Sequence, residues 1–304
     1  MLPRGIVSVL QTPFDVEDRV DSESLEQLID TSIEAGVDGF LAPAVASEVE
    51  FLTQSERTRI VNAVIATVDG RVPVIVGCSA DDVAVCRRQA GIAEELGALA
   101  YLVAVPQALY RDQSRVVDYF REVSESVGML LVVQDLEFQG PGLDMERIVD
   151  LRDAIPSMAG VKIETTPAGP KYSAVRAEFG TEFYVAGGWA VQQMIEALDR
   201  GVDAMIPESS MVKVYKEIDH RHRSGERAAS IELFQELLPI LAFTNQDLAT
   251  SIAFFKRLLV HRGIFATPEM RLPGFEWDRF NLRIADELID RYSRLEAALV
   301  ERGI

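Results

Sequence analysis

Ala159-Gly160-Val161-Lys162-Ile163-Glu164 is a short apolar run that contains one lysine and, two residues later, one glutamate. Side chains alternate along a strand, so Lys162 and Glu164 should point the same way. Burial disfavours a charged ammonium group and frees the neutral amine to attack a carbonyl, although a lysine at a strand end can also simply reach solvent. Only five of the 30 basic residues are lysines. The other four are expected in loops or helices with their ammonium groups in water: Lys171, Lys213, Lys216 and Lys256.

Similar apolar runs recur along the chain and alternate with amphipathic helical patterns. Each run is short and rich in Val, Ile, Leu or Ala, which is typical of parallel strands covered on both faces. The expected strands are Gly5–Leu10, Gly39–Ala42, Val72–Gly77, Ala100–Val105, Met129–Gln134, Gly160–Ile163, Phe183–Ala186 and Ala204–Ile206. The helical patterns include Ser24–Ala35, Ser55–Val68, Asp81–Leu96 and Gln192–Arg200.

Eight units of roughly 30 residues predict a (β/α)8 TIM barrel, whose chemistry lies at the carboxyl ends of the strands. The rival, an open doubly wound sheet, would carry a Gly-x-Gly-x-x-Gly turn after its first strand, and this chain has none there. Thr53 and Glu56 have the spacing of a capping box and predict the start of the second helix.

The last third of the chain has a different pattern. From Met211 to Ile304 it is helical throughout, with interruptions at Arg223-Ser224-Gly225 and Thr267-Pro268. We therefore expect a catalytic barrel over residues 1–224 and an all-helical C-terminal domain over residues 225–304. All three histidines fall in the helical part, away from the strand ends, which does not favour a zinc-dependent aldolase or a Ser-His-Asp hydrolase: His220, His222 and His261.

Composition narrows the range of partners. The chain has 304 residues, 48% of them hydrophobic, and a formal net charge of −18. So acidic a protein, with no basic run, is a poor partner for nucleic acid or an anionic membrane surface. Cys78 and Cys86 lack a CxxC spacing, and no signal peptide or membrane-spanning window is visible, so we expect a cytoplasmic protein with reduced thiols.

Several short motifs occur in an order that resembles one known family, the dihydrodipicolinate synthase / N-acetylneuraminate lyase family. The resemblance covers nearly the whole chain and includes the Gly-Ile-Lys that carries the family's Schiff-base lysine, here Gly160-Val161-Lys162. The other matching motifs are Thr12-Pro13-Phe14, Gly36-Val37-Asp38-Gly39, Leu52-Thr53-Gln54-Ser55-Glu56-Arg57, Arg71-Val72-Pro73-Val74-Ile75-Val76-Gly77, Gly97-Ala98 and Arg271-Leu272-Pro273. The family implies a barrel with a three-helix tail, a lysine imine, and a homotetramer built as a dimer of dimers.

The departures from the family concern its proton relay, which uses one threonine and two tyrosines. The family's Gly-Thr-Thr-Gly-Glu aligns with Ala44-Val45-Ala46-Ser47-Glu48, and its Pro-Tyr-Tyr with Pro106-Gln107-Ala108. Its Tyr-Asn aligns with Gln134-Asp135, and the arginine that grips the second substrate of the synthase falls near Gln139. All three relay hydroxyls are thus replaced, and we expect neither an authentic dihydrodipicolinate synthase nor an N-acetylneuraminate lyase.

A protonated Schiff base is an electron sink that still needs a group to move protons on the substrate. Strand-end carboxylates that could do so are Glu48, Asp135, Glu164 and Glu208, with a structural role the simpler interpretation of Glu48. Strand alternation turns only one of Gln134 and Asp135 inward, and the alignment selects Gln134. The predicted catalytic residues are Lys162, Glu164 and Gln134. The predicted substrate-binding residues are Ala46, Ser47, Gln107, Gly187, Gly188, Trp189 and Ile206.

Three functions are compatible with these residues. The first is a class I lyase, an aldolase or dehydratase that acts on a pyruvate-type or sugar-acid-derived 2-oxo acid without a cofactor. The second is a metal-dependent lyase in which Glu164 and another carboxylate hold the ion. The third is a non-catalytic or regulatory binding protein on an inherited barrel, since fold alone does not fix function.

Overall fold

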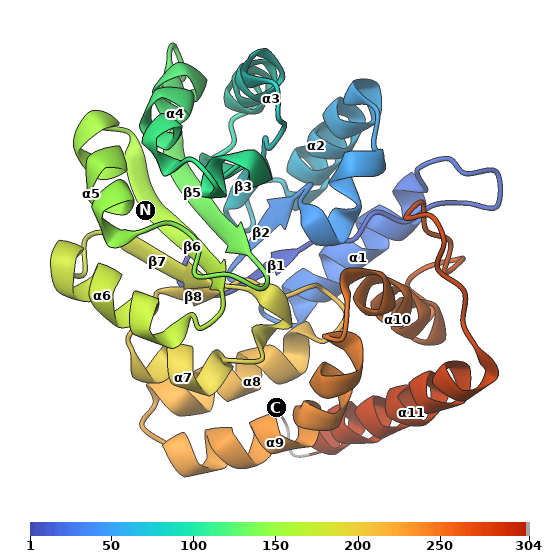
Figure 1. The fold of residues 1–304 in the computed structure, drawn as a ribbon. Coiled ribbons are helices and arrows are strands. Elements are labelled where there is room, and N and C mark those ends of the chain that lie inside the picture. The colour runs from blue at the N-terminus through green and yellow to red at the C-terminus, as the bar shows by residue number, and fades with distance from the viewer. Residues whose placement is uncertain (302–304) are drawn as a thin grey trace.

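Eight short, buried strands close into one parallel barrel in which each strand pairs with its neighbours in the sequence, and β1 pairs with β8 (Figure 1). This closed parallel barrel confirms the predicted TIM barrel. The computed structural model describes residues 1–301. The strands are β1 (Gly5–Val9), β2 (Gly39–Ala42), β3 (Val74–Gly77), β4 (Ala100–Ala104), β5 (Leu130–Glu137), β6 (Met158–Thr165), β7 (Tyr184–Gly187) and β8 (Ala204–Met205).

Helices α1 to α8 follow the strands and cover the outside of the barrel (Figure 1). The capping box at the start of α2 is present: the Glu56 N–H donates to Thr53 Oγ1 at 3.2 Å and the Thr53 N–H donates to Glu56 Oε2 at 2.8 Å. The helices are α1 (Ser22–Glu34), α2 (Gln54–Val68), α3 (Val83–Glu95), α4 (Val116–Ser124), α5 (Met145–Ala154), α6 (Gly169–Phe179), α7 (Met194–Asp199) and α8 (Val212–Arg223). Short 3-10 turns lie at 45–47, 49–51, 107–110, 113–115 and 189–191.

Strands β5 and β6 are longer than their apolar runs suggest. Each has eight residues, and their pairing extends as far as Glu137 opposite Thr165. The expected strands ended at Gln134 and Ile163, each of which is followed by an acidic residue, Asp135 and Glu164. In the structure this extension carries Glu164 and Leu136 past the body of the barrel to its carboxyl-terminal mouth.

Three further helices pack on one another: α9 (Arg227–Thr244), α10 (Leu248–His261) and α11 (Arg279–Glu301), and α9 and α11 also contact α8 (Figure 1). The interruption predicted at Thr267-Pro268 is present and is longer than those two residues, since residues 262–278 between α10 and α11 form no helix. Arg271 secures that segment, since its guanidinium donates to Glu56 and Asp18. The division at residue 224 stays a prediction, although the last barrel helix ends at Arg223.

The expectation that four of the lysines lie in water is wrong for Lys256. This residue lies on α10, is fully buried, and forms an ion pair with Glu48, which is also buried. Its Nζ also donates to the Glu269 carbonyl at 2.8 Å and lies 4.4 Å from the centre of the Phe14 ring. A helical pattern alone did not reveal that α10 turns this residue towards the barrel.

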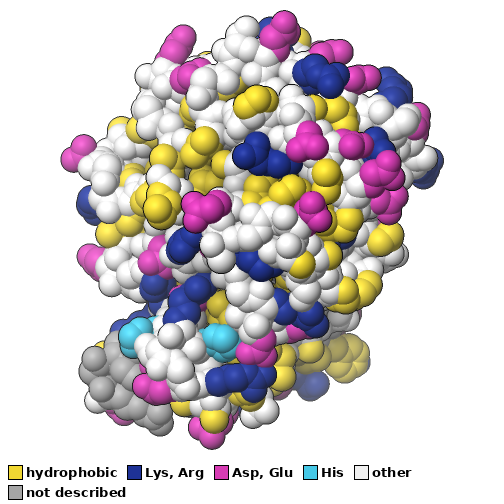
Figure 2. Space-filling model, turned by 90° about the vertical axis from the view of Figure 1, so that its left-hand side faces the viewer, with side chains coloured by type: hydrophobic (Ala, Val, Ile, Leu, Met, Phe, Trp, Pro, Cys, Tyr) yellow, Lys and Arg dark blue, Asp and Glu magenta, His cyan; other side chains and the backbone are white. Residues whose placement is uncertain are grey.

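The surface carries both signs of charge. Figure 2 shows acidic and basic side chains interspersed on the face that it displays, with no continuous basic area there. Among residues 1–301, no helix is long and apolar enough to cross a bilayer.

Candidate active site

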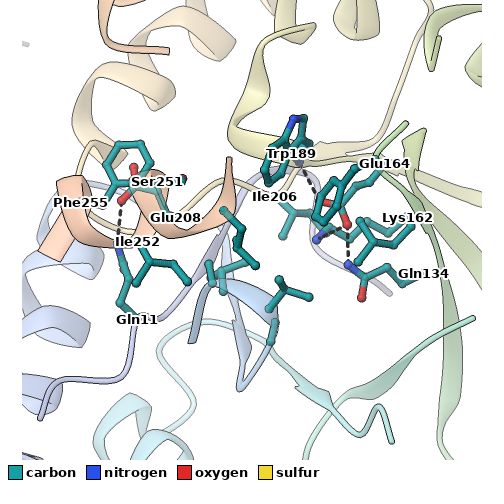
Figure 3. A pocket seen from close by; sticks show the side chains of 17 residues that line it. Gln11, Gln134, Lys162, Glu164, Trp189, Ile206, Glu208, Ser251, Ile252 and Phe255 are labelled. Atoms are coloured by element: carbon teal, nitrogen blue, oxygen red, sulfur yellow. Dashed lines mark hydrogen bonds and ion pairs between the residues drawn. The ribbon is translucent and has the colours of Figure 1, made fainter. Parts of the chain in front are cut away.

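A pocket opens at the carboxyl-terminal ends of the strands, where the chemistry of such barrels takes place (Figure 3). It encloses about 50 Å³. Both the barrel and helix α10 contribute to its walls, which are mostly apolar. The lining residues are Val9, Gln11, Ala44, Val45, Ala46, Gln134, Leu136, Phe138, Lys162, Glu164, Trp189, Ile206, Glu208, Leu248, Ser251, Ile252 and Phe255.

Lys162 and Glu164 form an ion pair inside this pocket. They stand two residues apart on β6, so their side chains share one face of the strand, and Lys162 Nζ lies 2.9 Å from Glu164 Oε2. Both residues are buried, with exposed fractions of 3% and 8%. A buried ion pair of this kind holds each partner in place and keeps a proton acceptor beside the amine.

Three donors fix the Glu164 carboxylate. Besides Lys162, the side-chain amide of Gln134 donates to Glu164 Oε2, and the Trp189 backbone N–H donates to Oε1 at 2.7 Å. Trp189 has φ of 49°, in the left-handed region that a large side chain rarely adopts. This backbone conformation belongs to the turn after β7 that carries the N–H to the carboxylate.

Gly188 lies directly against the ion pair. A Cβ atom at this position would lie 2.1 Å from Glu164 Oε1 and 2.7 Å from Lys162 Cε, so only glycine fits without displacing them. The rings of Trp189 and Phe138, which also line the pocket, contact each other with centres 4.2 Å apart and planes tilted by 48°. The turn after β7 thus presses backbone and aromatic surface onto Lys162 and Glu164.

Asp135 occupies the opposite face of β5 from Gln134. It is fully buried and binds Lys171 Nζ at 2.7 Å and the Tyr110 hydroxyl at 3.1 Å, both outside the pocket. Burial raises the pKa of the Asp135 carboxyl above its ordinary value. Gln134 is therefore the member of the Gln134-Asp135 pair that faces the pocket.

Six of the predicted site residues line the pocket: Ala46, Gln134, Lys162, Glu164, Trp189 and Ile206. Gly188 touches the ion pair through its backbone. The other three predicted binding residues are directed elsewhere. The Ser47 hydroxyl donates to the Leu10 carbonyl, and the exposed Gln107 donates to the Leu136 carbonyl at 2.9 Å. Gly187 faces outward, because a Cβ there would meet the Tyr172 hydroxyl at 2.6 Å.

The sequence prediction missed the whole contribution of helix α10. Leu248, Ser251, Ile252 and Phe255 follow the spacing i, i+3, i+4, i+7 and thus form one helix face, which lines the pocket. The amphipathic spacing was visible in the sequence. Nothing in it showed that this face meets a pocket instead of packing against another helix.

Glu208 and Gln11 also line the pocket, and neither was among the predicted site residues. Gln11 Nε2 donates to Glu208 Oε2 at 2.8 Å, and the Tyr215 hydroxyl donates to Oε1 at 3.2 Å. Burial raises the pKa of the Glu208 carboxyl. The position of Glu208 just after a strand had marked it as a candidate, whereas Gln11 follows an apolar run with no signal of its own.

Glu48 lies outside the pocket and holds the chain together. Besides Lys256, it accepts the backbone N–H groups of Arg271 at 2.6 Å and Leu272 at 2.9 Å. Burial lowers the pKa of Lys256 to about 8, although Glu48 opposes the shift. These contacts agree with a structural role for this carboxylate.

No metal-ligand set is evident. Within residues 1–301, no three His, Cys, Asp or Glu side chains are grouped so that they could hold one ion. All oxygens of Glu164 are already bonded by donors from the chain. The residues present therefore do not fit the metal-dependent alternative.

Comparison with known proteins agrees with this geometry. L-2-keto-3-deoxyarabonate dehydratase from Azospirillum brasilense is 27% identical over 277 residues, which cover 89% of this chain and 88% of that protein. Dihydrodipicolinate synthase from Rhodopseudomonas palustris superimposes with a TM-score of 0.87 at 23% identity, covering 95% of this chain and 97% of that one. The sialic acid aldolase from Ruminococcus gnavus gives a TM-score of 0.87 at 17% identity, covering 97% and 98%.

The model of the Dihydrodipicolinate synthetase family matches residues 2–283, nearly the whole chain. The match spans the barrel, the ion pair on β6 and the helix that completes the pocket. The chain therefore belongs to the dihydrodipicolinate synthetase family and is a lyase of the class I aldolase type.

Proposed function

We propose that Lys162 forms an imine with a 2-oxo acid and that the enzyme is a dehydratase or aldolase of a hydroxylated 2-oxo acid. The observation that supports this best is the buried Lys162–Glu164 ion pair in a pocket at the carboxyl ends of the strands. An amine can attack a carbonyl only after it loses its extra proton, and Glu164 Oε2 lies 2.9 Å from Lys162 Nζ, close enough to accept it.

The chemistry then follows from the imine. The amine adds to the substrate carbonyl, water leaves, and a protonated imine remains between Lys162 and the former carbonyl carbon. This imine accepts the electron pair released in either of two steps. In dehydration a proton leaves the adjacent carbon, and the hydroxyl group on the next carbon then departs as water; in cleavage the bond between these two carbons breaks while that hydroxyl loses its proton and becomes a carbonyl. Glu164, held by Gln134 and the Trp189 N–H, is the group placed to take either proton and to return it, to the departing hydroxyl in dehydration or to the enamine carbon in cleavage. Water then hydrolyses the imine and frees Lys162.

We propose further that the substrate differs from that of the synthase. Val45 and Ala46 line the pocket where the resemblance places two threonine hydroxyls, and Gln134 lines it where the resemblance places a tyrosine. An amide can orient Glu164 but cannot relay a proton as a phenol does. The named activity of the Azospirillum relative, dehydration of a keto-deoxy sugar acid, supports the same substrate class here.

Borohydride trapping tests the proposal. Incubation with pyruvate or L-2-keto-3-deoxyarabonate and borohydride should attach the reduced substrate to Lys162, as peptide mass spectrometry would show. Lys162→Arg keeps the charge but has no amine that can be deprotonated, so trapping should disappear. The matched control is Lys171→Arg, since Lys171 lies on α6, binds Asp135 on the outer face of β5 and does not line the pocket.

Two results would contradict the imine. Trapping that persists in Lys162→Arg would place the amine elsewhere. A parent protein that binds 2-oxo acids but neither traps nor converts any of them would support the non-catalytic alternative.

A further inference from the structure

Glu208 differs from every other buried carboxylate in the part of the chain that the structure describes. Residues 1–301 contain seven buried carboxylates, and six of them pair with a lysine or arginine. Glu208 is 5% exposed and has no such partner among these residues. It is also one of only two of the seven that line the pocket, and the other is Glu164. A buried acid without a cation is costly unless a ligand or a proton compensates for it.

The groups around Glu208 are neutral donors. Gln11 Nε2 lies 2.8 Å from Oε2, the Ser210 backbone N–H donates to the same oxygen, and the Tyr215 hydroxyl lies 3.2 Å from Oε1. They hold the side chain in one orientation and leave acceptor capacity on Oε1 unused. Glu208 is thus a polar group held in one orientation in the pocket wall.

Its position is across the pocket from the amine. Figure 3 shows Glu208, Gln11 and Ser251 on one side and Lys162, Glu164 and Gln134 on the other. The ladder pairs Ile163 with Gly187 and Gly187 with Met205, so Glu208 stands two residues nearer the mouth than Glu164. Two residues of strand correspond to about 7 Å, a few carbon–carbon bonds along a substrate.

Ser251 adds a second polar group at this end. Its side chain lines the pocket from α10, and its hydroxyl makes no hydrogen bond to another residue in the described part of the chain. Ile206 and Ile252 are among the apolar residues of the same wall. A substrate held at Lys162 and extending towards the mouth would therefore meet apolar surface and then these two polar side chains.

We infer that Glu208, oriented by Gln11 and joined by Ser251, forms a second subsite that binds a hydroxyl group on a substrate carbon distal to the carbonyl. The inference rests on the proposed function, because the imine with Lys162 defines which end of the substrate is distal. A 2-oxo acid brings its own negative charge into the pocket, which disfavours a second ionised carboxylate there. A neutral carboxyl group both donates and accepts, as a hydroxyl does, and the raised pKa of Glu208 agrees with this form.

The test compares two substrates that differ at the distal end. Half-saturating concentrations for borohydride trapping are measured for pyruvate, which has no distal hydroxyl, and for L-2-keto-3-deoxyarabonate. Glu208→Gln keeps the shape, but its amide oxygen must face the two donors from Gln11 and Ser210, so its NH2 group takes the place of Oε1 and offers the substrate hydroxyl no acceptor. This change should raise the half-saturating concentration of L-2-keto-3-deoxyarabonate about 10-fold and leave that of pyruvate within about twofold of the parent's value. Ser251→Ala should show the same selectivity and covers the case in which the first variant does not fold.

The control is Asp219→Asn, a buried carboxylate on α8 that pairs with Arg223 and does not line the pocket; it should change neither value. Equal losses for both substrates in Glu208→Gln and in Ser251→Ala would overturn the subsite, as would no loss for either. Selective trapping of 2-oxo-5-guanidinopentanoate that depends on Glu208 would overturn the assignment to a hydroxyl and indicate a cation site. Absence of trapping with every substrate in the parent would instead refute the proposed function.

Discussion

Glu48→Gln should destabilise the protein by an amount that can be worked out from the surroundings of Lys256. The change removes the only carboxylate that forms an ion pair with this fully buried ammonium group in residues 1–301 and leaves it the Glu269 carbonyl and the Phe14 ring. Each pH unit between the ordinary pKa of 10.5 and the pKa of about 8 in the folded protein is worth about 1.4 kcal/mol, so burial already costs about 3 kcal/mol. Without Glu48, the amine would lose its proton at pH 7, at a total cost of about 5 kcal/mol.

The expected loss of unfolding free energy at pH 7 is therefore about 2–3 kcal/mol. Neutralisation of Lys256 accounts for about 1–2 kcal/mol, and weaker acceptance of the Arg271 and Leu272 N–H groups for about 1 kcal/mol. This loss is smaller than the usual 3–5 kcal/mol for breaking a buried ion pair, because Lys256 can lose its proton and become neutral. Urea unfolding at pH 7 measures it, with the exposed Glu50→Gln as a control that should stay within about 0.5 kcal/mol.

The pH dependence gives a sharper check. The pKa of Lys256 in the folded protein lies below that in the unfolded chain, so between pH 8 and 10.5 the unfolded chain holds more protons and rising pH stabilises the fold. In Glu48→Gln the pH range in which rising pH stabilises the fold begins below pH 7. Between pH 7 and 8 the unfolding free energy of the variant therefore rises by about 1.4 kcal/mol per pH unit, whereas that of the parent gains nothing from Lys256. The difference between the two proteins should shrink to about 1 kcal/mol by pH 8.5. A difference that stays constant or grows from pH 7 to pH 8.5 would refute this account of the pair.

Two further substitutions test the site, and one measurement tests the assembly. Glu164→Gln should reduce turnover by roughly 10²–10⁴-fold while Lys162 still traps pyruvate, and turnover within a few-fold of the parent would make Glu164 purely structural. Gly188→Ala should lower the trapping rate at least about 10-fold with little change in melting temperature, because the added methyl group displaces the Lys162–Glu164 pair. A trapping rate equal to the parent's would show that the turn after β7 can move to accommodate the methyl group. Light scattering should show a homotetramer, an expectation from the family resemblance alone, and a monomer at micromolar concentration would refute it.

The barrel could be predicted from the sequence because its signal is local. A strand that is covered on both faces is a short apolar run, and eight such runs at even spacing are visible in the sequence without knowledge of tertiary contacts. Lys162 and Glu164 could be placed together for the same reason, since strand alternation fixes the relation between residues two apart. Strand alternation also placed Gln134 and Asp135 on opposite faces, and the alignment selected the face that the structure shows.

Tertiary contacts decided the rest. Lys256 looks like any lysine on a helix, and only the packing of α10 against the loop that holds Glu48 buries it. Gln107 follows a strand as a binding residue should, yet the turn that contains it directs its amide to the Leu136 carbonyl. Glu208 and Gln11 are distant in sequence and meet because β8 closes the barrel next to β1. No local pattern contains such information.

The origin of the pocket wall from α10 has a consequence for how this enzyme can change. Strand pairing fixes the positions of Lys162, Glu164 and Gln134, so under the proposed mechanism a substitution there disturbs the reaction itself. The helix face that lines the pocket consists of Leu248, Ser251, Ile252 and Phe255. Lys256, the next residue after Phe255, anchors this helix through its ion pair with Glu48. Substitutions on that face alter the space and polarity offered to the far end of the substrate and leave the imine centre intact. If Lys162 forms the imine as proposed, substrate range can thus diverge through a few residues of one helix while the imine centre on the strands stays unchanged.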